Sequence, residues 1–110
     1  MNHPNWVNFK DTGIEATSAV GCFPGGASPC GAEEMSGNVW EWCATKWQDS
    51  YKNYQNDNEL EGTALRVLRG GAFYNSGDYV RCGVRDGWYP DLRDRDYGFR
   101  VVLSPFTSGL

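Results

Sequence analysis

Two glutamates, Glu34 and Glu41, flank a short turn with the sequence M-S-G-N-V-W. Two carboxylates with backbone carbonyls between them form the set of hard oxygen ligands that Ca²⁺ prefers. Glu41 stands between two tryptophans on an expected strand, where a carboxylate without a cation would be costly to desolvate. The alternative is an ion pair between Glu41 and an arginine such as Arg69 or Arg100. The residues alone leave both interpretations open.

The chain has few residues that could support other metal or thiol chemistry. The chain has no C-x-x-C pair, its only histidine is His3, and its four cysteines are Cys22, Cys30, Cys43 and Cys82. A structural zinc site therefore lacks ligands. The first residues lack the basic and apolar regions of a secretory signal, and no run approaches the ~20 apolar residues of a membrane span. We expect a cytoplasmic protein with no membrane partner and four reduced, mostly buried thiols.

Length and charge narrow the class of protein. The 110 residues fit one small domain, and an aromatic content of 15% with only two methionines indicates a core built largely from rings. The net charge is −4, with three lysines against nine acids in residues 1–61 and seven arginines against five aspartates in residues 62–110. Because the arginines alternate with aspartates and form no basic stripe, we expect no nucleic-acid partner.

Short strands are the elements that must position these residues. Alternation in the first strand places Trp40 and Trp42 on one face, and Glu41 and Cys43 on the other. The strands are expected at residues 39–43, 65–68, 79–85 and 98–103. The last of these is the most apolar and is predicted to be the central strand.

Long loops are expected to connect these strands, and no stretch has the periodicity of a long helix. The density of Gly and Pro in residues 20–31 excludes a helix or an interior strand. Residues 48–61 are polar and predict a surface excursion, and residues 86–97 predict an exposed loop pinned by its side chains. Gly70 and Gly71 indicate a bulge or a close approach of two backbones.

Several motifs occur together in one order: VGCFPGGASPCGAEEMSGNVWEW, RVLRGGAF, RCGVRDGWYPDLRDRDYGFRVV and SPF. In this combination the chain resembles, from about residue 8 to residue 106, the C-terminal half of the formylglycine-generating enzyme family, also called sulfatase-modifying factors. The resemblance implies an α+β, C-type-lectin-like fold of short strands and long loops with little helix. The family's N-terminal half, with its R-L-P-T-E motif, is missing. We therefore expect a truncated domain at 1–110, or a minimal one that self-associates to complete its core.

The resemblance also implies a structural calcium ion. In similar proteins it is held at the positions of Glu34, Gly37, Val39 and Glu41, the glycine and the valine contributing backbone carbonyls. A second family site lies upstream, where Asn8, the Phe9 carbonyl and Asp11 are weaker counterparts.

Catalysis in this family uses O₂ and a copper ion held by two cysteines that follow R-G-G. The corresponding residues here, 72–81, contain no cysteine. Cys82 matches a family cysteine outside the copper pair, and we expect it to be a buried strand thiol. The resemblance therefore predicts no bound copper and no catalytic residues.

A binding module is the other class of function that the sequence indicates. Residues 73–97 combine aromatic rings with Asp and Asn, as antibody-like binding surfaces do. The candidate ligand-binding residues are Phe73, Tyr74, Asn75, Asp78, Tyr79, Asp86, Trp88, Tyr89, Asp94, Asp96 and Tyr97. The ligand would be a protein or peptide of unknown identity, and the alternative is that half of these rings are core.

Composition adds one further hypothesis about residues 72–97. Variable proteins diversified by retroelements share the lectin-like fold and vary mostly at AAC codons, which cannot yield Lys, Glu, Gln, Met or Trp. This segment has no Lys, Glu, Gln or Met, and Trp88 is its single exception. The favoured function is thus a calcium-stabilised display module. The alternative is a truncated formylglycine-generating oxidase that converts a sulfatase cysteine to formylglycine.

Overall fold

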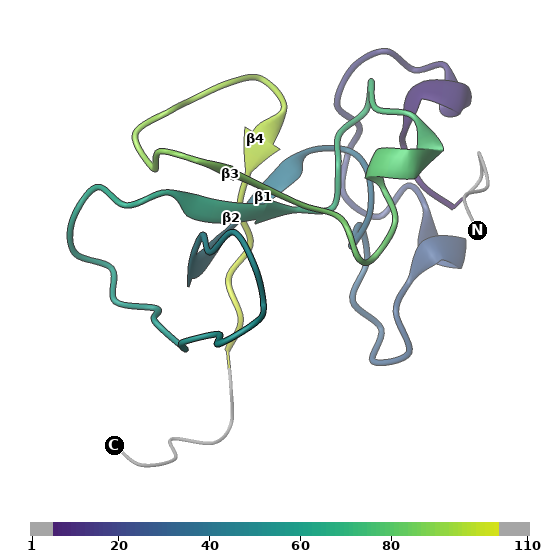
Figure 1. Ribbon diagram of the computed structural model, residues 1–110. Coiled ribbons are helices and arrows are strands. Elements are labelled where there is room, and N and C mark those ends of the chain that lie inside the picture. Colours follow the sequence, from purple (N-terminus) through teal and green to yellow (C-terminus); the bar gives the residue numbers. More distant parts are fainter. Residues whose placement is uncertain (1–5, 104–110) are drawn as a thin grey trace.

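The computed structural model describes residues 6–103, which form one small sheet with loops around it (Figure 1). The strands are β1 (Trp40–Lys46), β2 (Arg66–Arg69), β3 (Arg85–Trp88) and β4 (Tyr97–Gly98). The helical elements are three short 3₁₀ turns, η1 (Lys10–Thr12), η2 (Pro24–Gly26) and η3 (Gly77–Tyr79). Short strands, long loops and little helix are the expected architecture. No helix among the described residues has the length and apolar character needed to cross a bilayer.

The four strands lie in the order β3-β2-β1-β4. The β1 and β2 strands are antiparallel, with Glu41 opposite Arg69 and Trp42 opposite Leu68, and the register shifts beyond Trp42. Strand β3 pairs antiparallel with β2, and β4 pairs parallel with β1 through two residues. The central strands are therefore β1 and β2, which carry the candidate ligand Glu41.

The aromatic face of β1 packs against the main core. Trp40, Leu68 and Ala72 are buried together, with Trp42 and Tyr97 packed against them. The rings of Trp42 and Tyr97 meet edge to face, with centroids 5.7 Å apart. This arrangement confirms that Trp40 and Trp42 share a buried face, since a period of two follows directly from strand geometry.

Two strand predictions are wrong. Residues 79–85 form the end of η3 and a turn, and the strand begins only at Arg85. Residues 98–103 are not the central strand, because β4 is an edge strand that ends at Gly98. After Gly98 the side chains of Phe99, Val101, Val102 and Leu103 are between 76% and 96% exposed. An apolar run predicts burial only where another element covers it, and no described residue does so here.

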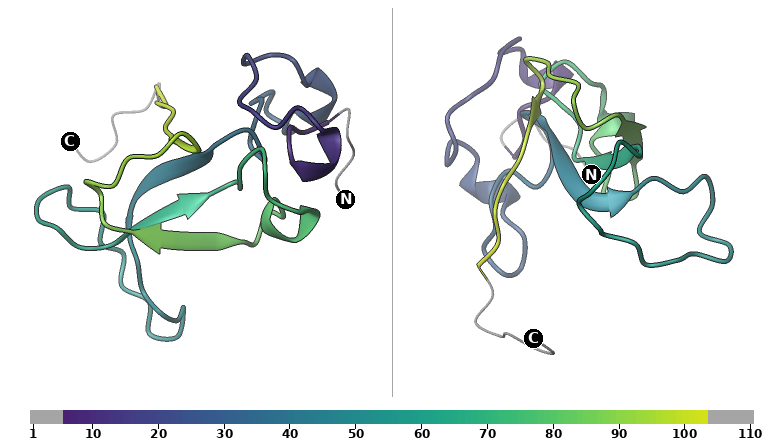
Figure 2. Two further views of the ribbon diagram at one scale, coloured as in Figure 1. Left: turned by 90° about the horizontal axis from the view of Figure 1, so that it is seen from above. Right: turned by 90° about the vertical axis from the view of Figure 1, so that its left-hand side faces the viewer.

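The loop predictions are largely confirmed. Residues 48–61 form an irregular surface excursion between β1 and β2, and Figure 2 shows it standing away from the sheet. Gly70 and Gly71 both have positive φ, and a Cβ on Gly71 would lie 2.8 Å from the Tyr79 carbonyl oxygen. Residues 86–97 are only partly a loop, because Trp88 ends β3 and Tyr97 begins β4.

The prediction of buried thiols is wrong. All four cysteines are free, as expected, but Cys22, Cys30 and Cys82 are exposed and only Cys43 is half-buried. Cys82 lies in a turn before β3 and not in a strand. The glycines and prolines around Cys22 and Cys30 keep that segment at the surface, because irregular backbone needs water for its polar groups.

Candidate functional site

The turn between Glu34 and Glu41 has an unusual backbone. Glu34, Gly37 and Asn38 all have positive φ, at 58°, 76° and 69°. A Cβ on Gly37 would lie 2.4 Å from the Asn8 carbonyl oxygen, so the position requires glycine both for its φ and for this close approach. Non-glycine residues with positive φ are costly and concentrate at functional sites.

Asn38 fixes this turn to the N-terminal segment, a role that the sequence analysis missed. Its side-chain Oδ1 accepts a hydrogen bond from the Ser18 amide at 2.9 Å, and its Nδ2 donates to the Ser18 carbonyl at 3.3 Å. Its backbone amide donates to the Asn8 carbonyl at 2.8 Å, and its carbonyl accepts from the Phe73 amide at 2.9 Å. An Asn after Gly signals a turn, but the sequence gives no sign of these distant partners.

A cavity of about 170 Å³ opens beside the turn. Its lining includes Gly37 and Val39 as well as three carboxylates, those of Glu33, Glu34 and Glu41, and the only cation is Arg100. The local charge is therefore negative by two when all three carboxylates are ionised. A cavity of this charge attracts a cation.

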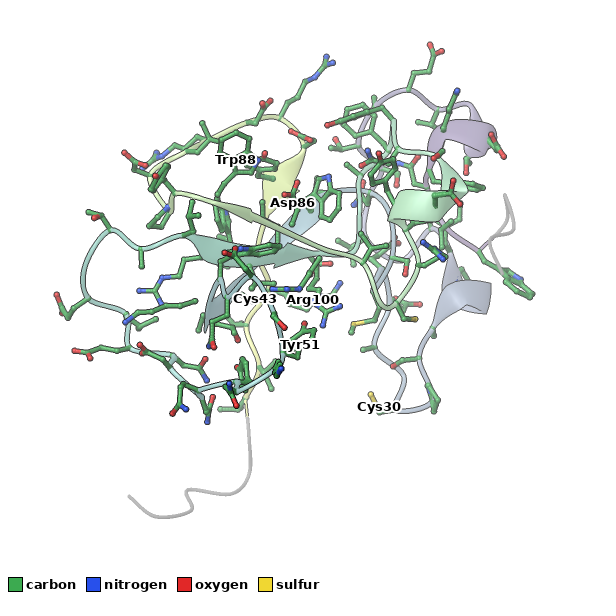
Figure 3. All side chains as sticks on the ribbon, viewed as in Figure 1. Cys30, Cys43, Tyr51, Asp86, Trp88 and Arg100 are labelled. Carbon is green, nitrogen blue, oxygen red and sulfur yellow. The ribbon has the colours of Figure 1, made fainter. Side chains whose placement is uncertain are left out.

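Arg100 lines this cavity and is labelled in Figure 3, where it lies beneath the sheet. It donates to both carboxylate oxygens of Glu41, from Nε to Oε1 and from Nη2 to Oε2. It also donates to the carbonyls of Glu33 and Glu34, at 2.7 and 2.6 Å. The hydrogen bond to Glu41 raises the pKa of the guanidinium. The structure thus contains the ion pair that the sequence analysis gave as the alternative to a metal at Glu41, and the partner is Arg100 and not Arg69.

Glu34 retains an acceptor without a partner. The residue is buried, its Oε1 accepts a hydrogen bond from the Gly21 amide at 3.3 Å, and its Oε2 is buried with no hydrogen-bond partner. Burial raises the pKa of this carboxyl group, partly offset by the Gly21 hydrogen bond. A buried carboxylate oxygen without a donor is costly unless a cation meets it. Glu34 Oε2 is thus an acceptor open to a calcium ion, whereas both carboxylate oxygens of Glu41 already accept from Arg100.

The weaker upstream site contains the second orphaned acceptor among the described residues. Asn8 is fully buried, and its Nδ2 donates to the Ala16 carbonyl and the Ser18 hydroxyl while its Oδ1 has no partner. Phe9 is also buried, whereas Asp11 is exposed on η1. Asn8 fits a cation better than Asp11 does.

A metal site can also be built from side chains alone, without backbone carbonyls. Within residues 6–103, no three His, Cys, Asp or Glu side chains gather closely enough to hold a metal ion. The calcium set described above combines two carboxylates with backbone carbonyls, which is the mixture that Ca²⁺ accepts.

The candidate binding residues divide into exposed and buried groups. Four rings are between 44% and 56% exposed, namely Tyr74, Tyr79, Trp88 and Tyr89, and the side chains of Asp78, Asp86 and Asp94 are exposed as well. Segments 73–84 and 89–96 extend from opposite ends of β3 (Figures 1 and 2). The exposed rings therefore do not share one pocket.

The remaining candidates have partners inside the fold. Phe73 and Asp96 are buried, and Tyr97 packs on the core. The Tyr74 hydroxyl donates to Asp96 Oδ2 at 2.8 Å, and this hydrogen bond, with burial, raises the pKa of Tyr74 to about 12. Asn75 Oδ1 accepts from the Ala72 amide at 2.8 Å. Phe73, Asn75, Asp96 and Tyr97 therefore lie beneath the exposed candidates and support them.

Thiol chemistry finds little support in the geometry. Residues 72–81 carry no cysteine, and Cys82 is exposed with no histidine among the described residues to activate it. Burial raises the pKa of Cys43, partly offset by Arg69, while the Ser28 hydroxyl lowers that of Cys30.

Comparison with known proteins places the chain in a family. Residues 2–105 match the Sulfatase-modifying factor enzyme 1-like domain. Hercynine oxygenase of Mycolicibacterium thermoresistibile is 37% identical over 93 residues, covering 76% of this chain and 21% of that protein. The chain thus spans about a fifth of the length of this curated relative.

Solved structures agree with this assignment. PvdO from Pseudomonas aeruginosa superposes with a TM-score of 0.76 at 30% identity, covering 89% of this chain and 39% of that one. Treponema denticola variable protein 1 has a TM-score of 0.68 at 29% identity, covering 86% and 34%. The sheet and loops are those of the C-type-lectin-like fold. The chain belongs to the formylglycine-generating enzyme, or sulfatase-modifying factor, family and represents part of its domain.

Proposed function

We propose that this chain is a non-catalytic, calcium-stabilised module that binds a protein or peptide through the exposed residues of 73–97. The observation that carries the proposal is the exposure of four large rings, Tyr74 and Tyr79 before β3 and Trp88 and Tyr89 at its end. Large rings are costly to leave in water and dominate binding energy where they meet a partner.

Calcium would act as a structural ion in this module. Gly37, Val39, Glu34 and Glu41 would hold it, with the unpartnered Oε2 of Glu34 as the clearest indication. The ion would balance the excess of carboxylates and fix the turn, which is hydrogen-bonded to residues 8, 18 and 73. It has no reaction step to perform here.

The most favourable part of the binding surface is the end of β3. Trp88 and Tyr89 are adjacent, and Tyr89 lies beside a groove of about 590 Å³ that also involves Leu60, Pro90 and Asp91. Tyr74 is held in place by Asp96, which lowers the entropy that a partner must remove. Tyr79 and Asp78, at the other end of β3, would contact a different part of the partner.

A diversified variable protein is a more specific form of this function. Two observations favour it, the absence of Lys, Glu, Gln and Met from residues 72–97 and the structural similarity to a variable protein at 29% identity. Genomic sequencing of independent isolates tests it. Substitutions concentrated in these codons, beside a reverse transcriptase and an imperfect repeat, would support diversification, whereas uniform codons would contradict it.

The apolar segment after β4 supports a second partner surface. Phe99, Val101, Val102 and Leu103 together expose an apolar strip at the edge of the sheet. Self-association would cover this strip. Sedimentation of the native chain and of Val101→Asp, Leu103→Asp tests this, since only the native chain should form dimers.

Binding is tested by selecting peptides from a random phage-display library on the calcium-loaded chain. Selected peptides should bind Trp88→Ala and Tyr89→Ala more weakly by over 1 kcal/mol each, as expected for hot-spot rings. Ile14→Ala, at an exposed apolar residue outside the segment, is the matched control and should bind like the native chain. Equal binding to all variants, or no enrichment, would contradict the proposed surface.

A further inference from the structure

A second cavity, of about 300 Å³, lies on the face of the sheet opposite the main core. Its lining includes Cys43 of β1, Val67 and Arg69 of β2, and Arg85 of β3. These residues alternate with Trp42, Leu68 and Asp86, whose side chains point to the core face. Tyr51 and Tyr54, from the excursion after β1, also line it, and Figure 3 shows Cys43 and Tyr51 on this side.

The cavity is positively charged within an acidic chain. Three cations line it, Lys46, Arg69 and Arg85, and no carboxylate does. Lys46 is neutralised by Asp57, whose Oδ2 lies 2.9 Å from its Nζ. No described carboxylate pairs with Arg69 or Arg85, because Glu41, which stands opposite Arg69 in the sheet, is held by Arg100. Two uncompensated guanidinium groups therefore remain.

Arg85 is fixed in one orientation before any ligand arrives. Its guanidinium carbon lies 4.0 Å from the ring centroid of Trp47 and 4.6 Å from that of Tyr51. Its Nη1 donates to the Gln48 carbonyl at 2.6 Å. Cation–π contacts with two rings leave only the edges of the planar group for a ligand, and such an edge matches a carboxylate.

Trp47 reaches this position because residue 87 is glycine. A Cβ on Gly87 would lie 2.7 Å from Trp47 Cε3, so any other residue there would displace the indole ring. Trp47 is also held by its Nε1, which donates to Asp49 Oδ1 at 2.8 Å. The stack on Arg85 thus depends on a specific small residue in β3.

Arg69 is oriented by the backbone. Its Nη1 donates to the carbonyls of Cys82 and Val84, at 2.9 and 3.2 Å. Each arginine therefore uses one nitrogen for structure, and no residue within 6–103 accepts a hydrogen bond from its other guanidinium nitrogens. Pre-oriented donors of this type bind planar oxyanions with two parallel hydrogen bonds.

We propose that this cavity binds the carboxylate of a small organic molecule through Arg69 and Arg85, with Tyr51 and Tyr54 packing on its flat apolar body. The volume is at the lower end for ligand pockets and suits a molecule of the size of benzoate. The site uses none of the exposed rings proposed for the protein or peptide partner, so either function can fail without the other.

Alkylation of Cys43, which lines the cavity, tests whether the cavity attracts carboxylates. Iodoacetate carries a carboxylate and iodoacetamide does not, and both alkylate thiolates, so the ratio of their rates cancels the reactivity of each thiol. The ratio at Cys43 should exceed that at the exposed Cys30 by about tenfold, as positive clefts concentrate anions. Arg69→Gln and Arg85→Gln should remove the difference, and Arg93→Gln, at an exposed residue outside the cavity, should keep it. Equal ratios at the two thiols in the native chain would overturn the proposal.

Calorimetric titration with benzoate tests binding directly. Benzoate should bind, and benzamide, the neutral isostere, should bind at least about tenfold more weakly because charge-assisted hydrogen bonds are lost. Gly87→Val should weaken benzoate by displacing Trp47, without changing any charge. Equal affinity for benzoate and benzamide would contradict the assignment, and tighter binding of phenyl phosphate would replace the carboxylate by a phosphate.

Discussion

Glu41 and Arg100, separated by 59 positions in the sequence, form a two-pronged ion pair that closes one side of the proposed calcium cavity. The same arginine holds the carbonyls of Glu33 and Glu34, so one side chain ties the segment after β4 to the turn before β1. A bound cation would share Glu41 with Arg100. The stability of the turn would then depend on the metal.

Calcium should raise the melting temperature of the chain. An ion that binds only the folded state adds about 2.7 kcal/mol of stability at 100 times its dissociation constant. Glu41→Gln should lower the melting temperature in chelator, because Arg100 loses its partner, and should abolish the increase caused by calcium. Glu59→Gln, in the exposed excursion, is the control and should respond like the native chain. Superimposable melting curves of the native chain in millimolar Ca²⁺ and in chelator would contradict the site.

Removal of Arg100 should have the opposite effect on calcium dependence. Arg100→Gln leaves three carboxylates in the cavity without a cation, and we expect a loss of roughly 1–3 kcal/mol in chelator. Calcium should restore more stability to this variant than to the native chain, because it then supplies the only positive charge. Urea unfolding with and without Ca²⁺ measures both quantities. An equal calcium increment in the two proteins would show that Arg100 and the ion do not share Glu41.

Local alternation made part of this site predictable. The pattern of Trp40, Glu41 and Trp42 correctly assigned the core face of β1, because strand geometry fixes which side chains share a face. For Glu41, the sequence left open either a metal or an ion pair with an arginine such as Arg69 or Arg100. The choice of Arg100 follows from β4 pairing parallel with β1, and two paired residues leave almost no signal in sequence.

Other features depend on packing that no local pattern reports. The most apolar stretch, residues 98–103, leaves the sheet after Gly98, and no described residue covers its side chains. The start of β3 at Arg85 is set by η3 and the turn that follows it. The second cavity, lined by Cys43, Arg69 and Arg85, was not predicted. These residues come from three strands, and only the register of the strands brings them together.

The Tyr74 hydroxyl should titrate above the ordinary pKa of a tyrosine. Its hydrogen bond to Asp96 raises its pKa to about 12, above the ordinary value of 10. Because the folded-state pKa is the higher one, the stabilising effect is complete below pH 10 and is lost as the pH rises through 12. Difference absorbance of the native chain and Tyr74→Phe near 295 nm isolates this group. A midpoint near pH 10 in the difference between the native chain and Tyr74→Phe would contradict the hydrogen bond.

The chain should not produce formylglycine. Residues 72–81, which correspond to the copper-binding segment of the family, contain no cysteine, and the exposed Cys82 stands alone. Copper-loaded protein incubated with O₂ and a C-x-P-x-R peptide should leave the peptide mass unchanged. Loss of the peptide thiol with formation of an aldehyde, above a protein-free control, would instead establish the oxidase function.

Substitution of Trp88 should separate its binding role from a structural one. Trp88 ends the edge strand β3 and is 44% exposed, whereas Leu68, in the central strand β2, is fully buried. Leu68→Ala should therefore cost roughly 2–5 kcal/mol of unfolding free energy, as large-to-small core substitutions do. Trp88→Ala should cost less than about 1 kcal/mol, because an exposed ring on an edge strand leaves no cavity. Urea unfolding of both variants makes the comparison, and a loss for Trp88→Ala as large as that for Leu68→Ala would make the ring structural and remove it from the binding surface.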